Sequence, residues 1–307
     1  MVERLVGELP GTCSLGEVVH LWERALRDDE LCSCGRPFSR CPFWTEVGAR
    51  AFGGWDRLDA GEVLRLKGDV DRNRHLPWLL LGARGRRRRS ALRQYLRLYE
   101  ALYRSAAEVS GADVVVDSSK HASLVYALRW SSALDLRVVH MVRDARAVAY
   151  SWSRRRRRPE AGDPSTMMPR WGPVRVSLWW DAFASAFLLL PLTGTPVRVV
   201  RYEDVMAAPT RELLRIADHA RLSVEEEDMA FLRHHEVDLS PSHAVAGNPM
   251  RFTVGTVPLR RDDEWRGRMP ATARRITSVM TTPLRLPLGY IRPSAGAVTR
   301  RPRRGDR

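Results

Sequence analysis

The fold is decided by two neighbouring stretches, VVVDSSKH (residues 114–121) and RVVHMVRDARAVAYSW (residues 137–152). Each begins with an apolar, β-branched run of strand length, which is typical of a buried parallel strand. Two serines and a lysine follow the first run, whereas Arg143 follows the second, with Ser151 eight residues further on. Because guanidinium, ammonium and hydroxyl groups donate hydrogen bonds to phosphate oxygens, the two strand ends predict a site for a multiply phosphorylated ligand.

The surrounding sequence predicts an α/β fold, a parallel sheet flanked by helices. Short apolar strands alternate with helical patterns, and this alternation favours right-handed crossovers within one sheet. Ligands bind beyond the carboxyl ends of the strands in such sheets. The predicted strands are 113–117, 137–142 and 197–201, and the predicted helices are 14–27, 93–109, 121–131, 145–155, 175–190, 210–219 and 271–282.

The 307-residue chain is strongly basic, with a formal net charge of +15. Anionic partners are therefore favoured, whether nucleic acid, a membrane surface or a phosphorylated small molecule. Five arginines lie within each of three clusters, 84–89, 154–158 and 300–307. The first two contain no aromatic residue of the kind that stacks on bases, so we expect solvated segments and no specific nucleic-acid partner.

The sequence predicts one domain in a reducing compartment. No apolar run has the length of a membrane span, since the best, Phe183–Leu192, is short and contains Pro191. Four cysteines and no secretory core at the N-terminus predict a cytoplasmic protein. No repeat or linker interrupts residues 1–290, whereas 291–307 is predicted to be an arginine-rich, disordered tail. The oligomeric state stays open.

Six motifs, in this order, resemble those of bacterial sulfotransferases that use 3′-phosphoadenosine 5′-phosphosulfate (PAPS). They are PGTCSLGE (10–17), LCSCGRPFSRCPFW (31–44), VVVDSSKH (114–121), VVHMVRDARAVAYSW (138–152), VRYEDVMAAP (200–209) and VAGNPMRFTVG (245–255). The resemblance implies a P-loop NTPase-like sulfotransferase fold with PAPS as co-substrate. It also implies transfer of a sulfonyl group to a hydroxyl of a carbohydrate, glycolipid or small metabolite.

The resemblance also implies that the N-terminal part of the domain is missing. Such enzymes open with a strand and a loop rich in Gly, Ser, Thr and Arg that binds the 5′-phosphosulfate. Residues 1–9 resemble the middle of the helix after that loop, and no such loop lies upstream of Pro10. The start is either assigned too late or truly truncated, and in this form we expect little sulfonyl transfer. An inactive relative and a P-loop-type small-molecule kinase remain alternatives, although no G-x4-G-K-[ST] run is present.

The same resemblance assigns the ribose end of the nucleotide. It implies that Arg143 and Ser151 bind the 3′-phosphate, the arginine through a charge-assisted contact. Arg251 matches loosely a late arginine that closes over this phosphate. The alternative for Arg143 is a structural ion pair with Asp144 or Glu203.

The residues around the sulfonyl group are implied to be catalytic. Glu17 is the first choice for the general base, although a first-turn glutamate is also favoured by the helix dipole alone. His121 is the rival base, and Lys120 would stabilise the bridging oxygen or the developing phosphate charge. Ser118 and Ser119 either bind sulfonate oxygens or form the turn.

Cys32, Cys34 and Cys41 form a C-x-C-x6-C pattern. Zinc sites prefer C-x2-C pairs and need a fourth ligand, which Cys13 or His20 could supply. Buried free thiols and a redox-sensitive pair are the alternatives. We therefore predict no metal from the sequence.

Overall fold

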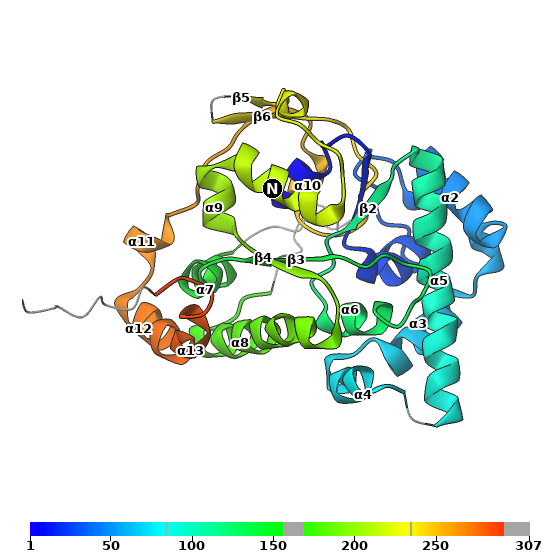
Figure 1. Cartoon of the computed structure of the whole chain (residues 1–307), viewed down its shortest axis with the longest axis horizontal. Helices are drawn as coiled ribbons and strands as arrows, with labels where there is room; N and C mark the ends of the chain where they lie inside the picture. The colour runs from blue at the N-terminus through cyan, green and yellow to red at the C-terminus, as the bar shows by residue number, and fades with distance from the viewer. Residues whose placement is uncertain (84, 156–166, 168, 234, 292–307) are drawn as a thin grey trace, which may run out of the picture.

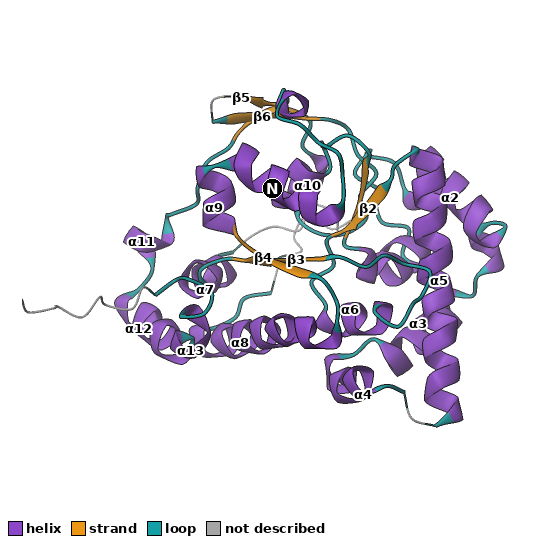
Figure 2. Ribbon diagram, viewed as in Figure 1, coloured by secondary structure: helices purple, strands orange, loops and turns teal. Residues whose placement is uncertain are grey.

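A computed structural model of the protein describes every residue except 84, 156–166, 168, 234 and 292–307 (Figure 1). It is an α/β structure in which short parallel strands are flanked by helices (Figure 2), as the sequence predicts. Almost all of the predicted tail and most of the arginine cluster at 154–158 lie outside the described residues.

The parallel strands form two pairs rather than one continuous sheet. Strand β1 (Thr12–Gly16) pairs with β2 (Val114–Asp117), and β3 (Val138–Val142) pairs with β4 (Val197–Arg201). No strand ladder joins the two pairs within the part of the chain that the structure describes. The three predicted strands are confirmed as β2, β3 and β4, whereas the single sheet that was expected to contain them is not found.

Strand β1 corrects the predicted helix over 14–27. Residues 12–16 form a strand, and only the rest is helical, as the 3-10 turn η1 (Val18–His20) and the π-helix η2 (Leu21–Arg27). Leu15 is fully buried in this strand. Its apolar spacing matches a helix as well, but parallel pairing with β2 satisfies the backbone groups of residues 12–16 and decides the outcome.

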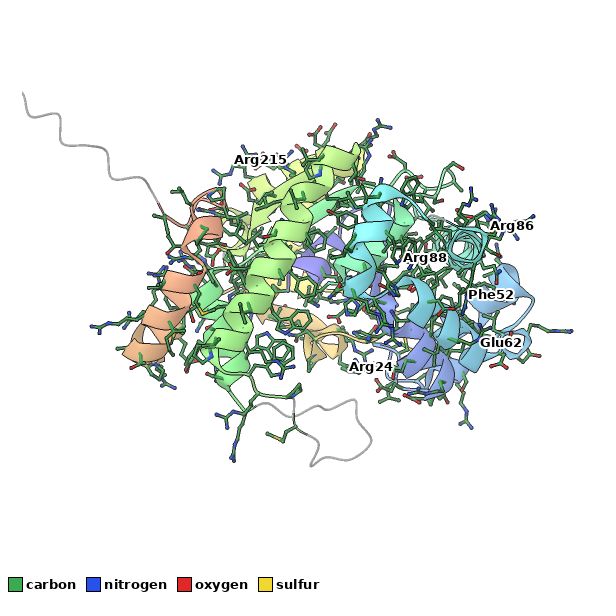
Figure 3. The ribbon with its side chains drawn as sticks, turned by 90° about the horizontal axis from the view of Figure 1, so that it is seen from below. Arg24, Phe52, Glu62, Arg86, Arg88 and Arg215 are labelled. Carbon is green, nitrogen blue, oxygen red and sulfur yellow. The ribbon has the colours of Figure 1, made fainter. Side chains whose placement is uncertain are left out.

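The helices on the β1–β2 side enclose the largest apolar core. The longest helix described, α5 (Arg86–Ser110), ends at Gly111, whose φ of 67° is the left-handed conformation typical of a glycine that ends a helix. Figure 3 shows Arg86 and Arg88 at the start of α5, so this arginine cluster extends the predicted helix over 93–109 towards its N-terminus. The other helices here are α2 (Pro42–Phe52), α3 (Ala60–Val70), α4 (Leu76–Leu81) and α6 (Ala122–Leu128).

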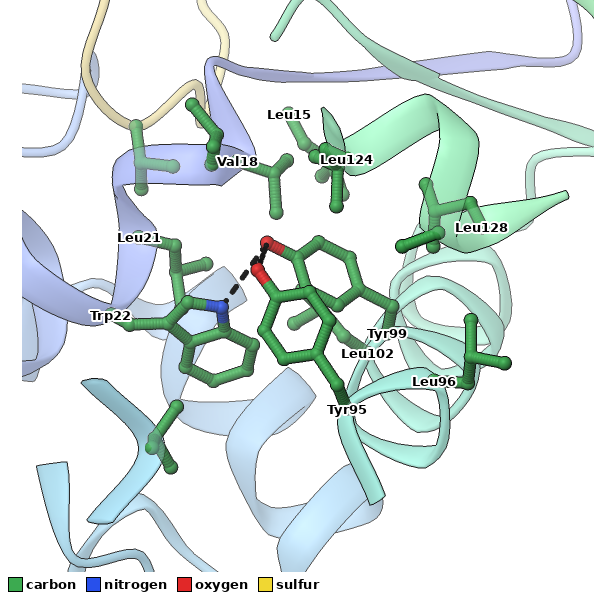
Figure 4. Close-up of a cluster of buried hydrophobic side chains, with 14 of the residues drawn as sticks. Leu15, Val18, Leu21, Trp22, Tyr95, Leu96, Tyr99, Leu102, Leu124 and Leu128 are labelled. Carbon is green, nitrogen blue, oxygen red and sulfur yellow. Dashed lines mark hydrogen bonds between the residues drawn. The ribbon is translucent and has the colours of Figure 1, made fainter. Parts of the chain in front are cut away.

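A hydrogen-bonded chain of aromatic side chains crosses this core (Figure 4). Trp22 Nε1 donates to the Tyr99 hydroxyl (3.2 Å), which lies 3.2 Å from the Tyr95 hydroxyl. Tyr95 donates to Asp71 (3.1 Å), which also accepts from the Ser123 hydroxyl (2.6 Å). Burial is the main cause that raises the pKa of Tyr95 and of Tyr99, so both hydroxyls stay protonated and able to donate.

Helices cover both faces of the β3–β4 pair. Figure 1 shows α9 (Tyr202–Ala207) and α10 (Pro209–Ala220) on one side, with α7 (Ala145–Ser153) and α8 (Pro173–Leu189) on the other. The chain then continues into α11 (Trp265–Arg268), α12 (Ala271–Met280) and α13 (Thr282–Arg285). The predicted helices over 121–131, 145–155, 175–190, 210–219 and 271–282 are thus all present, most of them with shifted ends.

A small antiparallel sheet occupies a segment that the sequence left irregular. It consists of β5 (Leu232–Arg233), β6 (Glu236–Leu239) and β7 (Gly255–Pro258). Helix α1 (Val2–Val6) packs on β6 and α10. Strands of two to four residues carry too few positions for an alternating pattern to be recognised.

Helix α8 and the turn after it give one candidate membrane span. Residues Pro173–Thr193 have a mean hydropathy of 1.4 and are long and apolar enough to cross a membrane, judged by length and composition alone. A mostly buried core helix of a soluble protein passes the same test, whereas 28% of this window is buried, although α8 packs against α7 and α12. This one helix is therefore weak evidence for a membrane span.

His140 joins β3 to α8 and gives the fold a pH dependence. Its ring stacks on Phe187 (centroids 4.9 Å apart), and burial lowers its pKa to about 4. Between that value and the unfolded pKa of about 6.5, only the unfolded chain binds the proton, so the free energy of unfolding falls as the pH falls.

We therefore expect His140→Phe to flatten the dependence of stability on pH between 6.5 and 4. One histidine changes this slope by up to about 1.4 kcal/mol per pH unit. Urea unfolding at several pH values measures it. His235→Asn, at an exposed position, is the control and should keep the original slope. Equal slopes for His140→Phe and the unsubstituted protein would contradict this account.

Candidate active site

The turn after β2 is built around the carboxylate of Asp117. One oxygen accepts from the backbone N–H of Ser119 (2.8 Å) and of Val18 (3.3 Å), and the other accepts from the Tyr103 hydroxyl (2.7 Å). Burial raises the pKa of Asp117, while these hydrogen bonds act in the opposite direction. Asp117 thereby fixes residues 118–121 against the start of η1, which directly follows Glu17.

The structure separates the two serines that the sequence left equivalent. The Ser119 hydroxyl accepts a hydrogen bond from the backbone N–H of Val19 (2.8 Å), which gives it a part in forming the turn. The Ser118 hydroxyl is buried and has no hydrogen-bond partner among the described residues. An unpaired buried hydroxyl is costly, so Ser118 is the better candidate for a ligand contact.

Glu17 and Lys120 face each other across the ends of β1 and β2. The Lys120 ammonium donates to Glu17 Oε1, and His20 Nε2 lies 3.8 Å from Oε2. The Lys120 side chain is 71% exposed, whereas that of Glu17 is 15% exposed. Gly247 (φ 96°) packs over the glutamate, and a Cβ there would lie 3.2 Å from Glu17 Cγ. Gly247 therefore packs against the Glu17 side chain, and the Lys120 ammonium pairs with its carboxylate from the solvent-exposed side.

Two histidines complete this group. The rings of His20 and His121 meet edge to face with centroids 5.6 Å apart. Burial lowers the pKa of His20 to about 4 and also lowers that of His121. Both rings are therefore neutral near pH 7 and able to accept a proton. The sequence considered His20 only as a metal ligand, although its position three residues after Glu17 could have placed it here.

Arg143 lies at the carboxyl end of β3 and is held by an acidic side chain that the sequence did not identify. Its Nη2 contacts Asp262 Oδ2 (2.9 Å), and not Asp144 or Glu203. The guanidinium also stacks over the Tyr202 ring (4.8 Å). Its Nε is buried without a hydrogen-bond partner in the described structure. The group is therefore oriented, with donor capacity left over.

The two carboxylates considered for Arg143 have other partners. Asp144 caps α7 by accepting from the backbone N–H of Arg146 (2.9 Å), and it also binds that residue's guanidinium. Glu203 accepts from the backbone N–H of Asp144 (3.1 Å) and from the Tyr290 hydroxyl (2.6 Å). These contacts set the direction in which α7 leaves β3.

Ser151 lies two turns into α7 and is half-buried. No direct contact between Ser151 and Arg143 is found in the described structure. A shared phosphate contact by these two residues therefore stays a prediction.

Arg251 lies in the interior, with its side chain 3% exposed. Its Nη1 donates to the carbonyls of Leu31 (2.9 Å) and Ala244 (3.0 Å), and the guanidinium stacks on Phe252. These contacts favour a structural role, and closure of Arg251 over a phosphate stays a prediction.

An aromatic stack starts one residue after Ser151 and was missed by the sequence analysis. Trp152 stacks on Trp171 (centroids 4.3 Å apart), and the series continues through Trp179 to Phe183 on α8. Trp179 is 39% exposed, so part of this surface is open to solvent. Aromatic faces of this kind can stack on a flat ring of a ligand.

Residues 95–237 match the Sulfotransfer_1 family, the sulfotransferase domain. This match supports a sulfotransferase family, and the matched region contains Lys120, His121, Arg143 and Ser151. Among solved structures, the sulfotransferase domain from the curacin biosynthetic pathway is similar, with a TM-score of 0.49 and 15% identity over 92% of this chain and 91% of that one. No curated protein matches the chain.

The different environments of the two serines predict different mutational effects. Ser119→Ala leaves the Val19 N–H without its acceptor and should lower the free energy of unfolding by about 1–3 kcal/mol. Ser118→Ala removes a hydroxyl without a partner and should leave stability unchanged or slightly raised. Urea denaturation of the two variants measures the difference, and equal losses would show that the described hydrogen bond is unimportant.

Proposed function

We propose that the protein transfers a sulfonyl group from PAPS to a hydroxyl of a carbohydrate, glycolipid or small metabolite. The observation that carries this proposal is the turn after β2, which lies inside the sulfotransferase match and brings Lys120 and His121 to Glu17. A base, a mobile cation and an unpaired hydroxyl at one strand end are what such a transfer needs.

In this reaction the acceptor oxygen attacks sulfur and forms a new O–S bond. The bond between sulfur and the bridging phosphate oxygen breaks, and its electron pair goes to the leaving 5′-phosphate. The acceptor proton passes to Glu17 or to His121. We assign Lys120 to the developing phosphate charge, because its exposed side chain can leave Glu17 and turn to an anion.

Glu17 remains our first choice for the base and His121 the alternative. One oxygen of Glu17 is hydrogen-bonded to Lys120, and the other lies near His20. Once Lys120 turns to the donor, the carboxylate is free to accept a proton. His121 needs no such rearrangement, since burial already keeps it neutral.

We place the ribose phosphate of the donor at Arg143 and Ser151. Arg143 has spare donor capacity at Nε, and its present partner, Asp262, has a 36% exposed side chain. A phosphate that replaces the Asp262 carboxylate would keep the guanidinium in a charge-assisted contact. The domain would comprise residues 1–290 and work in the cytoplasm, where its four free thiols stay reduced.

Arg143→Ala should weaken the binding of adenosine 3′,5′-bisphosphate by about 1.5–3 kcal/mol, which is roughly a tenfold to hundredfold rise in Kd. Titration calorimetry measures the change. Arg233→Ala removes the same charge from the antiparallel sheet and is the matched control, with unchanged Kd. Asp262→Asn should strengthen binding, since it removes the competing carboxylate. An Arg143→Ala protein with the original affinity would exclude Arg143 from the site.

In a form of the protein extended upstream of Met1, Glu17→Gln should lower the rate of sulfonyl transfer from radiolabelled PAPS by a factor of about 100 or more, without weakening nucleotide binding. His121→Gln is the paired variant. If Glu17 is the base, His121→Gln keeps most of the turnover. If turnover survives in Glu17→Gln and is lost in His121→Gln, the base is His121. Full activity in both variants would refute this assignment of the base.

A further inference from the structure

The three cysteines of the 31–44 segment meet one histidine from a distant loop. The ligand atoms of Cys32, Cys34, Cys41 and His243 all lie within 4.8 Å of one another. Cys41 Sγ is 3.6 Å from Cys32 Sγ and 3.7 Å from Cys34 Sγ. His243 Nδ1 is 3.2 Å from Cys41 Sγ and 3.7 Å from Cys32 Sγ.

We propose that these four side chains bind one Zn²⁺ as a closed, structural Cys3His site. Zinc prefers four thiolate and imidazole ligands in a tetrahedron, with Zn–S of about 2.3 Å and Zn–N of about 2.0 Å. Those bond lengths place tetrahedral ligand atoms about 3.8 Å apart for S···S and about 3.6 Å apart for S···N. The four separations given above differ from these values by about 0.4 Å or less, and no pair of ligand atoms is more than 4.8 Å apart, so an ion fits after a small adjustment of the ligands.

The same distances show that no disulfide joins these thiols in the structure. A disulfide requires sulfur atoms about 2.05 Å apart, far shorter than the distances here. Cys13, suggested by the sequence as a fourth ligand, is not part of the cluster, and His20 lies beside Glu17. The true fourth ligand is 202 residues from Cys41 in the chain, which is why no spacing pattern pointed to it.

The surroundings hold each ligand in place. The imidazole of His243 stacks on the Phe43 ring (centroids 5.0 Å apart, 10° between planes). The backbone carbonyl of His243 accepts a hydrogen bond from Trp44 Nε1 (2.7 Å). Backbone N–H groups of Cys34 and Trp44 donate to the sulfurs of Cys32 and Cys41, respectively. Such donors stabilise thiolate, the form that binds zinc. Four protein ligands leave no position for substrate, so the site is structural rather than catalytic.

The cluster clamps two segments that support the candidate active site. Ser33 reinforces the clamp, because its N–H donates to the Ala244 carbonyl (3.1 Å) and its hydroxyl contacts Ser242. One residue further on, the Val245 carbonyl accepts from the backbone N–H of Glu17 (3.0 Å). Gly247 then packs on the Glu17 side chain. Zinc would thus fix the wall behind Glu17 without touching the reacting groups.

Elemental analysis of the full-length protein, purified without chelator, tests the proposal. We expect about one zinc per chain, and Co²⁺ in its place should show the intense absorption of tetrahedral thiolate coordination. Cys13→Ser, the matched control outside the cluster, should retain the metal. Cys41→Ser and His243→Ala should lose it, whereas His243→Cys should keep one ion with an altered Co²⁺ spectrum.

A second measurement does not depend on the folding of these variants. In Cys13→Ser protein, the three remaining thiols should resist a thiol reagent until a chelator removes the metal. A protein that contains no metal after growth with zinc would overturn the proposal. So would thiols that react fully without chelator, or a disulfide within the cluster, which would support the redox-sensitive pair instead.

Discussion

The half-buried carboxylate of Asp117 is the constraint on which the candidate site depends. Asp117 is the last residue of β2. Its carboxylate accepts hydrogen bonds from the backbone N–H of Ser119 in the following turn, from the backbone N–H of Val18 in η1 and from the Tyr103 hydroxyl of α5. A carboxylate in the interior is costly unless it is hydrogen-bonded, and here three donors converge on it. Any displacement of β2 against β1 or α5 would break one of these contacts. Lys120, His121 and Glu17 therefore meet because Asp117 fixes the backbone of both strand ends.

The site is basic, yet most of its arginines are not free to attract an anion. Arg143, Arg146 and Arg201 are each paired with an aspartate, namely Asp262, Asp144 and Asp204. Paired guanidinium groups are oriented but partly neutralised, so the formal charge of +15 overstates the field at the strand ends. Lys120 differs, because its exposed ammonium can exchange one carboxylate for another anion at small cost. Under the proposed function, phosphate binding at Arg143 would require displacement of Asp262, and sulfonyl transfer would require Lys120 to leave Glu17.

The sequence predicts the local elements of this fold better than their assembly. Strands β2, β3 and β4 were found because each is an unbroken apolar run between turn signals, and α5 because Leu and Tyr recur at helical spacing up to Gly111. Strand β1 was missed because Leu15, Val18 and Val19 fit a helix equally well, and only pairing with β2 decides. The partner of Arg143 was missed for a similar reason. Asp262 lies 119 residues away along the chain, in a segment without a motif.

Contacts between distant parts of the chain also explain why the fourth residue of the cysteine cluster was missed. The spacing in the sequence showed three cysteines without a fourth ligand. In the fold, His243, more than two hundred residues further along the chain, lies beside them. The same part of the chain also brings Arg251 inward, where it bridges the carbonyls of Leu31 and Ala244. The segments 31–44 and 240–251 are therefore held together by the ligand cluster, by Ser33 and by a buried guanidinium. A surface loop would not need three separate sets of contacts to hold it in place. Here these contacts keep Val245 within hydrogen-bond distance and Gly247 within van der Waals distance of Glu17. If the Glu17 carboxylate were displaced, it could no longer contact Lys120.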